Sequence, residues 1–550
     1  MKIVNFLHSA LNLSVMIRYR KYLLFSFFTL LLIGICNGQL VSNVLTFDST
    51  NSKFTSIEND GSGAFYFSGY VRPFVTGTSD FGNLSYQGYW YEDGLSCKAQ
   101  ISGLLDWMTV SGNSNGLEDC KQIKHSGSSV YSCGKFVSSS SSLFVNSVNH
   151  TYPYGCCHGG YVLKQTDLGG FEWIFPLDAY ALDLDVDNQG NVYVVSEKSL
   201  KKISSSGTEL WDVDLTSVND AKILVRSDTV YISAMFQSFL ILGGTPLEPL
   251  GAANDVDVFF ARFTGSGSFI SVTQIGSPGT DLFHDIAFDT NNNLWISGEC
   301  PDSAYFGGQS ICGSGSRIYF LQLNSLLQIQ RCEVVQVDSL IHFPVITGEM
   351  IFNYYNERIA VMNVSNALII QNDTIHINIG GGYEGTAILV KWDNSGAIVW
   401  ALPLAMSLTQ TTNAAWVSAH LLLDTNQDIF LAGQMREACT LDGISYNAGH
   451  YYCAYFAELH DTTVVNSVFH PQNSIHVRCT NPVTSQARIF FDREFSGDCR
   501  VFNSSGALVF SRTLNHSREL FVPTETWESG VYIVQNTDGV TSVYSKLIKM

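Results

Sequence analysis

The sequence predicts an all-β protein built from repeated small sheets, and three observations lead to this prediction. The 550 residues are 45% hydrophobic and 13% aromatic but only 14% charged, so the chain can bury a large core. Glycine occurs 46 times against 12 prolines, and tyrosine and phenylalanine are abundant, which favours short strands joined by tight turns over long helices. A turn-and-strand motif also recurs through most of the chain.

The chain is strongly acidic. It has 49 aspartates and glutamates against 30 lysines and arginines, which gives a formal net charge of −19. This excess repels polyanions such as nucleic acid and acidic membrane surfaces. The sequence therefore predicts no nucleic-acid partner.

The N-terminal segment has the pattern of a secretory signal peptide. A basic segment, residues 18–21, precedes an apolar run over residues 22–36, which is too short for a comfortable bilayer span. We expect a signal peptide over residues 1–38, with Met16 as a candidate start. No later apolar run reaches the roughly 18 residues that a membrane helix needs, so no transmembrane span is expected after signal removal.

The cysteines indicate an oxidising compartment. Thirteen are present, and twelve remain once Cys36 of the signal segment is removed, an even number that favours a disulfide framework. The adjacent Cys156 and Cys157, followed by His158, are weak evidence for a metal site, and disulfide bonding is the preferred reading. The predicted local bridges join Cys300 to Cys312, Cys439 to Cys453 and Cys479 to Cys499.

The first repeated motif is an acidic or polar turn followed by a short hydrophobic strand that ends in Ser-Gly or a close variant. Clear copies lie at residues 60–69, 289–298 and 424–433. Weaker copies end at Gly134, Ser196, Ala234 and Asn363. Successive copies end 38 to 70 residues apart, which indicates seven units.

A second motif, Lys-x4-Gly-x3-Trp, follows the first within the same units. Its copies begin at Lys98, Lys164, Lys202 and Lys391. Each motif is a strand, a turn and a strand, so each unit holds two hairpins, the content of one β-propeller blade. We expect a β-propeller of about seven blades over residues 39–470, with six or eight left open. Large side chains are expected to fill the space between blades, namely Trp107, Trp173, Trp211, Trp295 and Trp400.

The repeats resemble those of secreted bacterial β-propeller proteins. Residues 285–298 carry the first half of the family pattern, and residues 388–400 carry the second half. The resemblance extends diffusely over residues 44 to 470 and implies a propeller fold, but it implies no single activity.

The long units carry insertions that the short third unit lacks. Equivalent loops of a propeller leave the same face, and repeat insertions often form a binding surface. The insertions hold several aromatic residues, so we expect a platform for a glycan or protein ligand, and the alternative that the insertions pack only on themselves stays open. The candidate binding residues are Trp90, Tyr154, Tyr305 and Tyr446.

The C-terminal residues 471–550 form a separate segment with alternating strands, which predicts a small β-sandwich. Its motifs resemble the C-terminal sorting domain of the type IX secretion system of Bacteroidota. The resemblance rests on Asn481, Pro482, Gly506, Gly530, Tyr532 and Lys549. It implies recognition by the type IX secretion machinery, passage through the periplasm, and release or attachment at the outer-membrane surface.

The sequence holds no strong catalytic motif. There is no H-E-x-x-H, no phosphate-binding loop and no dinucleotide-binding glycine pattern between a strand and a helix. Residues 112–116 fit G-x-S-x-G, but they join two units and are expected to form a turn rather than a nucleophile elbow.

Three acidic turns place oxygen atoms at alternate positions, as calcium loops do. They begin at Asp187, Asp289 and Asp424, but they lack the glycine and the late glutamate of a calcium loop. Because Asp and Asn are also common in tight hairpin turns, no cofactor is expected, with calcium as the one alternative. Asp183, Asp185 and Asp187 share a strand face that we expect to be a solvated edge.

These observations favour a secreted or surface-attached propeller that binds a ligand and is not an enzyme, and no catalytic residue is assigned. One alternative is an extracellular polysaccharide lyase or hydrolase, in which His284 and His420 would work with carboxylates near the central axis. The other alternative is a purely structural surface protein.

Overall fold

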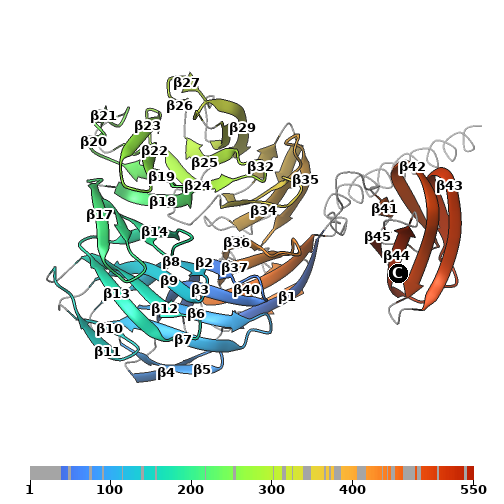
Figure 1. Cartoon of the computed structure of the whole chain (residues 1–550), viewed down its shortest axis with the longest axis horizontal. Coiled ribbons are helices and arrows are strands. Elements are labelled where there is room, and N and C mark those ends of the chain that lie inside the picture. The colour runs from blue at the N-terminus through green and yellow to red at the C-terminus, as the bar shows by residue number, and fades with distance from the viewer. Residues whose placement is uncertain are drawn as a thin grey trace, which may run out of the picture. The chain divides into compact units, whose positions relative to one another are not determined.

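The structure, a computed structural model, describes residues 39–549 apart from short connecting segments, of which the longest are residues 338–348, 377–385, 405–416 and 462–476. The chain divides between His460 and Asp461 into two compact units. Both units are built of antiparallel strands, and the described residues contain no helix (Figure 1).

The N-terminal unit is a seven-bladed β-propeller. Each blade is a sheet with four core strands, and the first strands of successive blades contact one another in a closed ring around the central axis. From the axis outward, the blades consist of β2 (Asn51–Asn59), β3 (Ala64–Arg72), β6 (Asp93–Gln100) and β7 (Leu105–Gly112); β8 (Asp119–Ser126), β9 (Ser129–Phe136), β12 (Gly159–Thr166) and β13 (Phe171–Leu177); β14 (Ala181–Val186), β15 (Val192–Ser196), β16 (Ser199–Ile203) and β17 (Glu209–Asp214); β18 (Val218–Arg226), β19 (Thr229–Phe236), β22 (Asp257–Thr264) and β23 (Phe269–Gly276); β24 (Leu282–Phe288), β25 (Leu294–Cys300), β28 (Arg317–Leu323) and β29 (Ile329–Val337); β30 (Met350–Phe352), β31 (Arg358–Val364), β34 (Thr386–Trp392) and β35 (Ile398–Pro403); and β36 (Val417–Leu423), β37 (Ile429–Met435), β40 (Cys453–Asp461) and β1 (Gln39–Phe47).

The ring is closed by the N-terminal strand. The outermost strand of the seventh blade is β1, which pairs with β40 from the far end of the propeller sequence (Figure 1). The seventh sheet therefore contains both ends of the propeller chain, and the expected blade number of about seven is confirmed.

Six blades carry an additional hairpin between their second and third strands. The hairpins are β4 (Gly77–Phe81) with β5 (Leu84–Gly88), β10 (Ser142–Val145) with β11 (Val148–Thr151), β20 (Leu240–Leu242) with β21 (Thr245–Leu247), β26 (Tyr305–Phe306) with β27 (Gln309–Ser310), β32 (Ala367–Ile370) with β33 (Asp373–His376), and β38 (Ala438–Leu441) with β39 (Ile444–Asn447). The β10–β11, β26–β27 and β32–β33 hairpins extend the outer edge of the preceding blade. The third blade has only Glu197 and Lys198 between β15 and β16, which explains its short repeat.

The repeated tryptophans join neighbouring blades by hydrogen bonds. The indole Nε1 donates to a backbone oxygen in the outer turn of the next blade, at 2.9–3.1 Å, in three pairs: Trp107 to Asp167, Trp173 to Ser205 and Trp211 to Gly265. The turn must approach the indole closely, because a Cβ at Gly207 would lie 3.0 Å from the Trp173 ring, and this glycine has a φ of +84°. In the fifth blade Arg331 takes the tryptophan position and donates to the Asn394 oxygen at 2.8 Å. Trp295 differs, because it lies on the second strand of its blade and is almost fully buried.

The expected disulfide framework does not include four of the twelve cysteines, because Cys332 is a free, exposed thiol and three others are free and buried. Cys97, Cys120 and Cys133 are free thiols and lie fully inside the blades. Cys97 is part of the core strand β6 and not of an insertion. The three predicted bridges stay predictions, since the side chains of Cys312, Cys439 and Cys479 lie outside the described residues.

The C-terminal unit is a small five-stranded domain with its own core. It consists of β41 (Val477–Cys479), β42 (Gln486–Asn503), β43 (Leu508–Pro523), β44 (Gly530–Thr537) and β45 (Ser542–Lys549). The long β42 changes register between Phe490 and Gly497; both halves pair with β43, and on the other edge the first half pairs with β41 and the second with β44. Tyr532 closes the core and donates its hydroxyl to the Glu528 oxygen at 2.8 Å.

Candidate functional site

The central axis of the propeller holds a small polar cavity. Its volume is about 130 Å³, and residues of all seven innermost strands or their first turns line it. The charged side chains in the lining are Lys124, Asp183, Lys222, Asp285 and Glu349. Asp183 was expected at a solvated edge, and this expectation is wrong: the residue is 2% exposed because it faces the axis.

Most acidic groups of this axial cavity have a donor from the next blade. Asp183 accepts hydrogen bonds from Gln122 Nε2 at 2.7 Å and from the Ile223 amide at 2.9 Å. The Met350 amide donates to Asp285 Oδ2 at 2.9 Å. These bonds pass from one innermost strand to the next and therefore join the blades at the axis.

Glu349 is the most strongly stabilised carboxylate of the cavity. His420 Nδ1 lies 2.7 Å from its Oε1, the Leu421 amide donates to its Oε2 at 3.0 Å, and Lys222 Nζ lies 3.8 Å away. Burial opposes ionisation, but the charges of His420 and Lys222 outweigh it and lower the pKa of Glu349 to about 2. Asp285 is less well supplied, since burial raises its pKa to about 7 despite the opposing charge of Lys222.

The two histidines singled out from the sequence each lie beside a glutamate. His420 pairs with Glu349 at the axis, whereas His284 Nε2 lies 3.7 Å from Glu299 Oε2. The two pairs involve different carboxylates, so the structure does not bring the two histidines onto one shared acid.

A second cavity lies beside an inserted hairpin of the second blade. We call it the β10–β11 groove; its volume is about 250 Å³, and it is lined by Leu143, Asn149, His150, Thr151, Tyr152, Tyr161, Ile174 and Pro176. The His150 ring lies 4.9 Å from the Phe171 ring, and burial lowers the pKa of His150. The groove therefore combines aromatic surface with a neutral imidazole and an amide, the mixture typical of small-ligand sites.

The structure brings one of the four predicted binding aromatics to this groove. Tyr154 is 55% exposed, and its ring meets the lining residue Tyr152 edge-on at 5.7 Å. Tyr305 is also exposed, but it lies on the β26–β27 hairpin of the fifth blade. Trp90 and the side chain of Tyr446 lie outside the described residues.

The sequence reasoning missed His150, which lies in the groove next to Tyr152. Its signal was weak, because a single histidine on a predicted hairpin has no motif around it. Strand alternation could have suggested that His150 of β11 and Tyr152, one residue beyond its end, project to the same side, but only the fold shows that His150 lies beside Phe171.

The calcium-like turns have a local explanation. In each turn the first aspartate accepts the amides two and four residues later, at 2.8–2.9 Å, as seen for Asp187, Asp289 and Asp424. One carboxylate oxygen of each aspartate is thus used by its own hairpin turn, which accounts for the alternating Asp and Asn residues.

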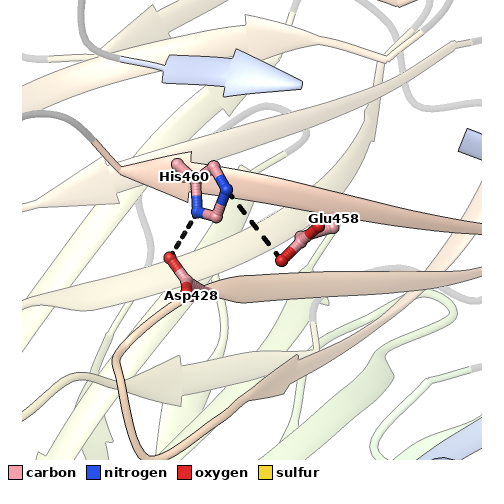
Figure 2. A group of neighbouring side chains, drawn as sticks. All are labelled: Asp428, Glu458 and His460. Atoms are coloured by element: carbon pink, nitrogen blue, oxygen red, sulfur yellow. Dashed lines mark hydrogen bonds and ion pairs between the residues drawn. The ribbon is translucent and has the colours of Figure 1, made fainter. Parts of the chain in front are cut away.

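A mixed group of metal-ligand types lies at the rim of the seventh blade (Figure 2). His460 Nδ1 is 2.6 Å from Asp428 Oδ1, and its Nε2 is 3.9 Å from Glu458 Oε1. Glu458 pairs across the strand with Phe430, in the position that Lys98 and Lys164 hold opposite Tyr66 and Tyr131. The side chains are partly exposed, so this acidic corner can exist without an ion.

Comparison with known families identifies the end of the chain. Residues 481–550 match the model of the secretion system C-terminal sorting domain. The tail is a type IX sorting domain. It directs the protein to the cell surface or out of the cell and is recognised by the type IX secretion system. Of the residues predicted to mark this domain, Gly530 and Tyr532 lie on β44 and Lys549 on β45, whereas Asn481, Pro482 and Gly506 lie outside the described residues.

Several solved structures are distantly similar to this chain. No curated protein matches the chain. A thermostable family-43 glycoside hydrolase is 8% identical, with 49% of this chain and 92% of that chain covered and a TM-score of 0.27. The extracellular domain of a putative one component system from B. thetaiotaomicron is 8% identical, with 92% of this chain and 100% of that chain covered and a TM-score of 0.20. PorZ, a surface component of the type IX secretion system of Porphyromonas gingivalis, is 8% identical, with 92% of this chain and 100% of that chain covered and a TM-score of 0.18. The propeller assignment rests on the order of strands in the seven sheets.

Among the residues that the structure describes, no helix is long and apolar enough to cross a membrane.

Proposed function

We propose that this secreted or surface-attached propeller is a non-catalytic carbohydrate-binding protein that holds its ligand at the inserted hairpins. The observation that carries the proposal is the β10–β11 groove, which His150 and Tyr152 line and whose Tyr152 contacts the exposed Tyr154. Aromatic faces with a few polar groups suit a sugar, which has apolar C–H faces and polar edges.

The size of the groove supports a small ligand or one unit of a longer chain. At about 250 Å³ it approaches the lower end of small-molecule sites, which span roughly 300–1,000 Å³. Its polar groups include the Asn149 amide and the His150 imidazole. One end of the groove borders an inserted hairpin, the kind of element that varies most readily among repeats.

The state of the axial cavity supports binding without catalysis. Its volume of about 130 Å³ is too small for a sugar chain to enter between a general acid and a general base. Glu349 contacts His420, Lys222 and a backbone amide, so its carboxylate oxygens are already used by interactions within the protein. A general acid or base must instead reach the substrate proton.

The test is a glycan array combined with a polysaccharide-degradation screen on the purified protein. We expect binding without turnover, and at least a tenfold loss of affinity in His150→Ala and Tyr154→Ala. Phe239→Ala is the matched control, because Phe239 is 53% exposed beside another inserted hairpin but lies away from the groove lining. Equal binding by all three variants would refute the groove as the site, and capture of a peptide in place of a glycan would refute the ligand class.

The competing function is a polysaccharide lyase or hydrolase at the axis. The observation that favours it is the buried His420–Glu349 pair next to Asp285 in one cavity. Turnover of a polysaccharide that disappears in Glu349→Gln but survives in Tyr154→Ala would establish this reading. If the protein shows neither binding nor turnover, the remaining alternative is a purely structural surface protein.

A further inference from the structure

Two pairs of buried carboxylates occupy equivalent points of the propeller, outside the groove and the axial cavity. Asp93 is the first residue of β6, and Asp257 is the first residue of β22, so each begins the third strand of its blade. Glu118 and Asp281 directly precede β8 and β24, the first strands of the following blades. The pairs Asp93–Glu118 and Asp257–Asp281 therefore lie at the same junction, three blades apart.

An equivalent backbone hydrogen bond holds the two acids of each pair near one another. The Glu118 amide donates to the Glu92 oxygen at 3.0 Å, and the Asp281 amide donates to the Val256 oxygen at 2.7 Å. In both cases the acceptor is the residue just before the first acid of the pair. The fold thus places the second acid beside the first by a repeated device.

The four side chains are fully buried and only partly satisfied. All four have an exposed fraction of 0%. Asp93 Oδ2 accepts the Tyr89 amide at 2.9 Å, and Asp281 Oδ2 accepts the Ser277 amide at 2.6 Å. The oxygens without a hydrogen-bond partner are Oδ1 of Asp93, both Oε atoms of Glu118, Oδ1 of Asp257 and Oδ1 of Asp281.

No base neutralises these carboxylates at close range. Among the ion pairs of the described residues, which include Lys135 with Asp119, none involves a member of either acid pair. Burial raises the pKa of Asp93 to about 7, and burial together with the charge of Asp93 raises the pKa of Glu118 to about 9. A buried, unpaired carboxylate costs several kcal/mol, so the repeated arrangement calls for a counter-charge.

The backbone closes tightly around the acids. A Cβ at Gly112 would lie 2.4 Å from Asp93 Oδ1, and a Cβ at Gly276 would lie 2.1 Å from Asp257 Oδ2. Gly112 ends β7 and Gly276 ends β23, so the two glycines are equivalent as well. A Cβ at Gly116 would meet both Glu118 Oε1 and the Val137 carbonyl oxygen, at 1.8 and 2.4 Å, so a backbone carbonyl oxygen lies near this acid.

We propose that each acid pair binds one calcium ion, giving two calcium sites per chain. Calcium takes oxygen ligands from carboxylates and backbone carbonyls in flexible geometry; carboxylates are present at both junctions, and a backbone carbonyl oxygen lies near the acid at the first. Each ion would supply the missing charge and bridge two neighbouring blades. This proposal does not depend on carbohydrate binding.

The test is isothermal titration of CaCl2 into the full-length protein after EGTA treatment. We expect two equivalents of calcium to bind, with dissociation constants of about 10⁻⁴–10⁻³ M as in extracellular modules. Glu118→Gln and Asp281→Asn should each reduce the stoichiometry from two to one, and the double variant should reduce it to zero. Both substitutions keep side-chain size while removing a buried charge, so folding is expected and can be checked by circular dichroism.

Asp187→Asn is the matched control, because the Asp187 carboxylate accepts the backbone amides of Gln189 and Asn191 within its own hairpin turn. This variant should still bind two ions. Calcium should also raise Tm of the parent protein but leave that of the double variant unchanged. The proposal is overturned if millimolar calcium neither binds nor raises Tm, which is the result expected if each pair shares a proton instead, or if the variants bind as much calcium as the parent.

Discussion

The axial cavity and the two acid pairs bury the same kind of side chain under opposite conditions. At the axis, Glu349 has a histidine, a lysine and a backbone amide around it, and its pKa falls to about 2. At the blade junction, no described side chain donates a hydrogen bond to either Glu118 oxygen, and the pKa of Glu118 rises to about 9. Burial alone therefore does not identify a ligand site in this molecule. The supply of donors separates a carboxylate that holds the fold from one that awaits a counter-charge.

The strongest test of this comparison removes the lysine of the axis. Lys222→Met leaves the largely buried Asp285 and Glu349 without their shared cation, so that the axial cavity would resemble the acid pairs. Because the Lys222 and Glu349 side chains are 26% and 15% exposed, we expect a loss of about 2–4 kcal/mol in the free energy of unfolding, somewhat less than for a fully buried ion pair. Urea denaturation at pH 7 measures it.

Lys121→Met is the control for this variant. Lys121 Nζ lies 3.3 Å from Asp119, but its side chain is 42% exposed, so we expect a loss of at most about 1 kcal/mol. Similar losses for the two variants would show that the axial lysine has no special role.

The next test concerns Asp285, the least well supplied acid of the axis. Burial raises its folded pKa to about 7, above the value of about 3.9 in the unfolded chain, so the folded protein binds the proton more tightly. Its contribution to stability is therefore present at low pH and is lost as the pH rises from about 4 to 7. Asp285→Asn should remove this loss, so the variant should gain about 2–4 kcal/mol over the parent between pH 4 and pH 8.

Urea unfolding at several pH values checks this prediction. Asn can still accept the hydrogen bond of the Met350 amide, which keeps the contact between blades. A constant difference between the parent and Asp285→Asn from pH 4 to pH 8 would contradict the raised pKa.

A smaller effect sets the scale for an uncharged donor. Trp107→Phe keeps the aromatic ring between the first and second blades but loses the 2.9 Å hydrogen bond from Nε1 to the Asp167 oxygen. We expect a loss of about 1 kcal/mol in the free energy of unfolding. Trp173→Phe, where the equivalent bond is more exposed, should lose less, and the reverse order would show that ring packing decides the effect.

The smallest effect is expected at the acidic corner of the seventh blade. Glu458→Lys introduces the lysine that four other blades have at this position and places a cation near Asp428, whose side chain contacts His460 among the described residues. Because these groups are partly exposed, we expect a gain of about 0.5 kcal/mol in the free energy of unfolding. A destabilised variant would indicate that the two acids and the histidine are needed as a group.

The sequence was sufficient for the architecture because the repeat encodes it. The spacing of the two motifs predicted seven blades, and the short third copy predicted a blade without an inserted hairpin. The lysine and tryptophan positions also predicted packing between blades. Motifs within one unit are local, and local patterns can be read from one sequence.

The sites could not be predicted in the same way, because they join residues of different blades. Asp183 was expected to face water, since alternation shows which residues share a face but not that this face borders the axis. Asp93 and Glu118 lie 25 residues apart, and no motif relates them. The glycine turn at residues 112–116 was interpreted as a simple connection, and only the fold shows that its glycines approach these acids.

The position of β1 in the seventh blade bears on the order in which the blades fold. Its partner β40 begins more than 400 residues later, so their pairing carries the entropy cost of closing the longest loop in the propeller. Blades one to six can form from hairpins whose strands are near in sequence, whereas the seventh must wait for both ends. Proteolytic removal of residues 39–47 would leave the other six sheets complete but would remove the outermost strand of the seventh. We therefore expect the pairing of β1 with β40 to form last during folding and to separate first when the propeller opens.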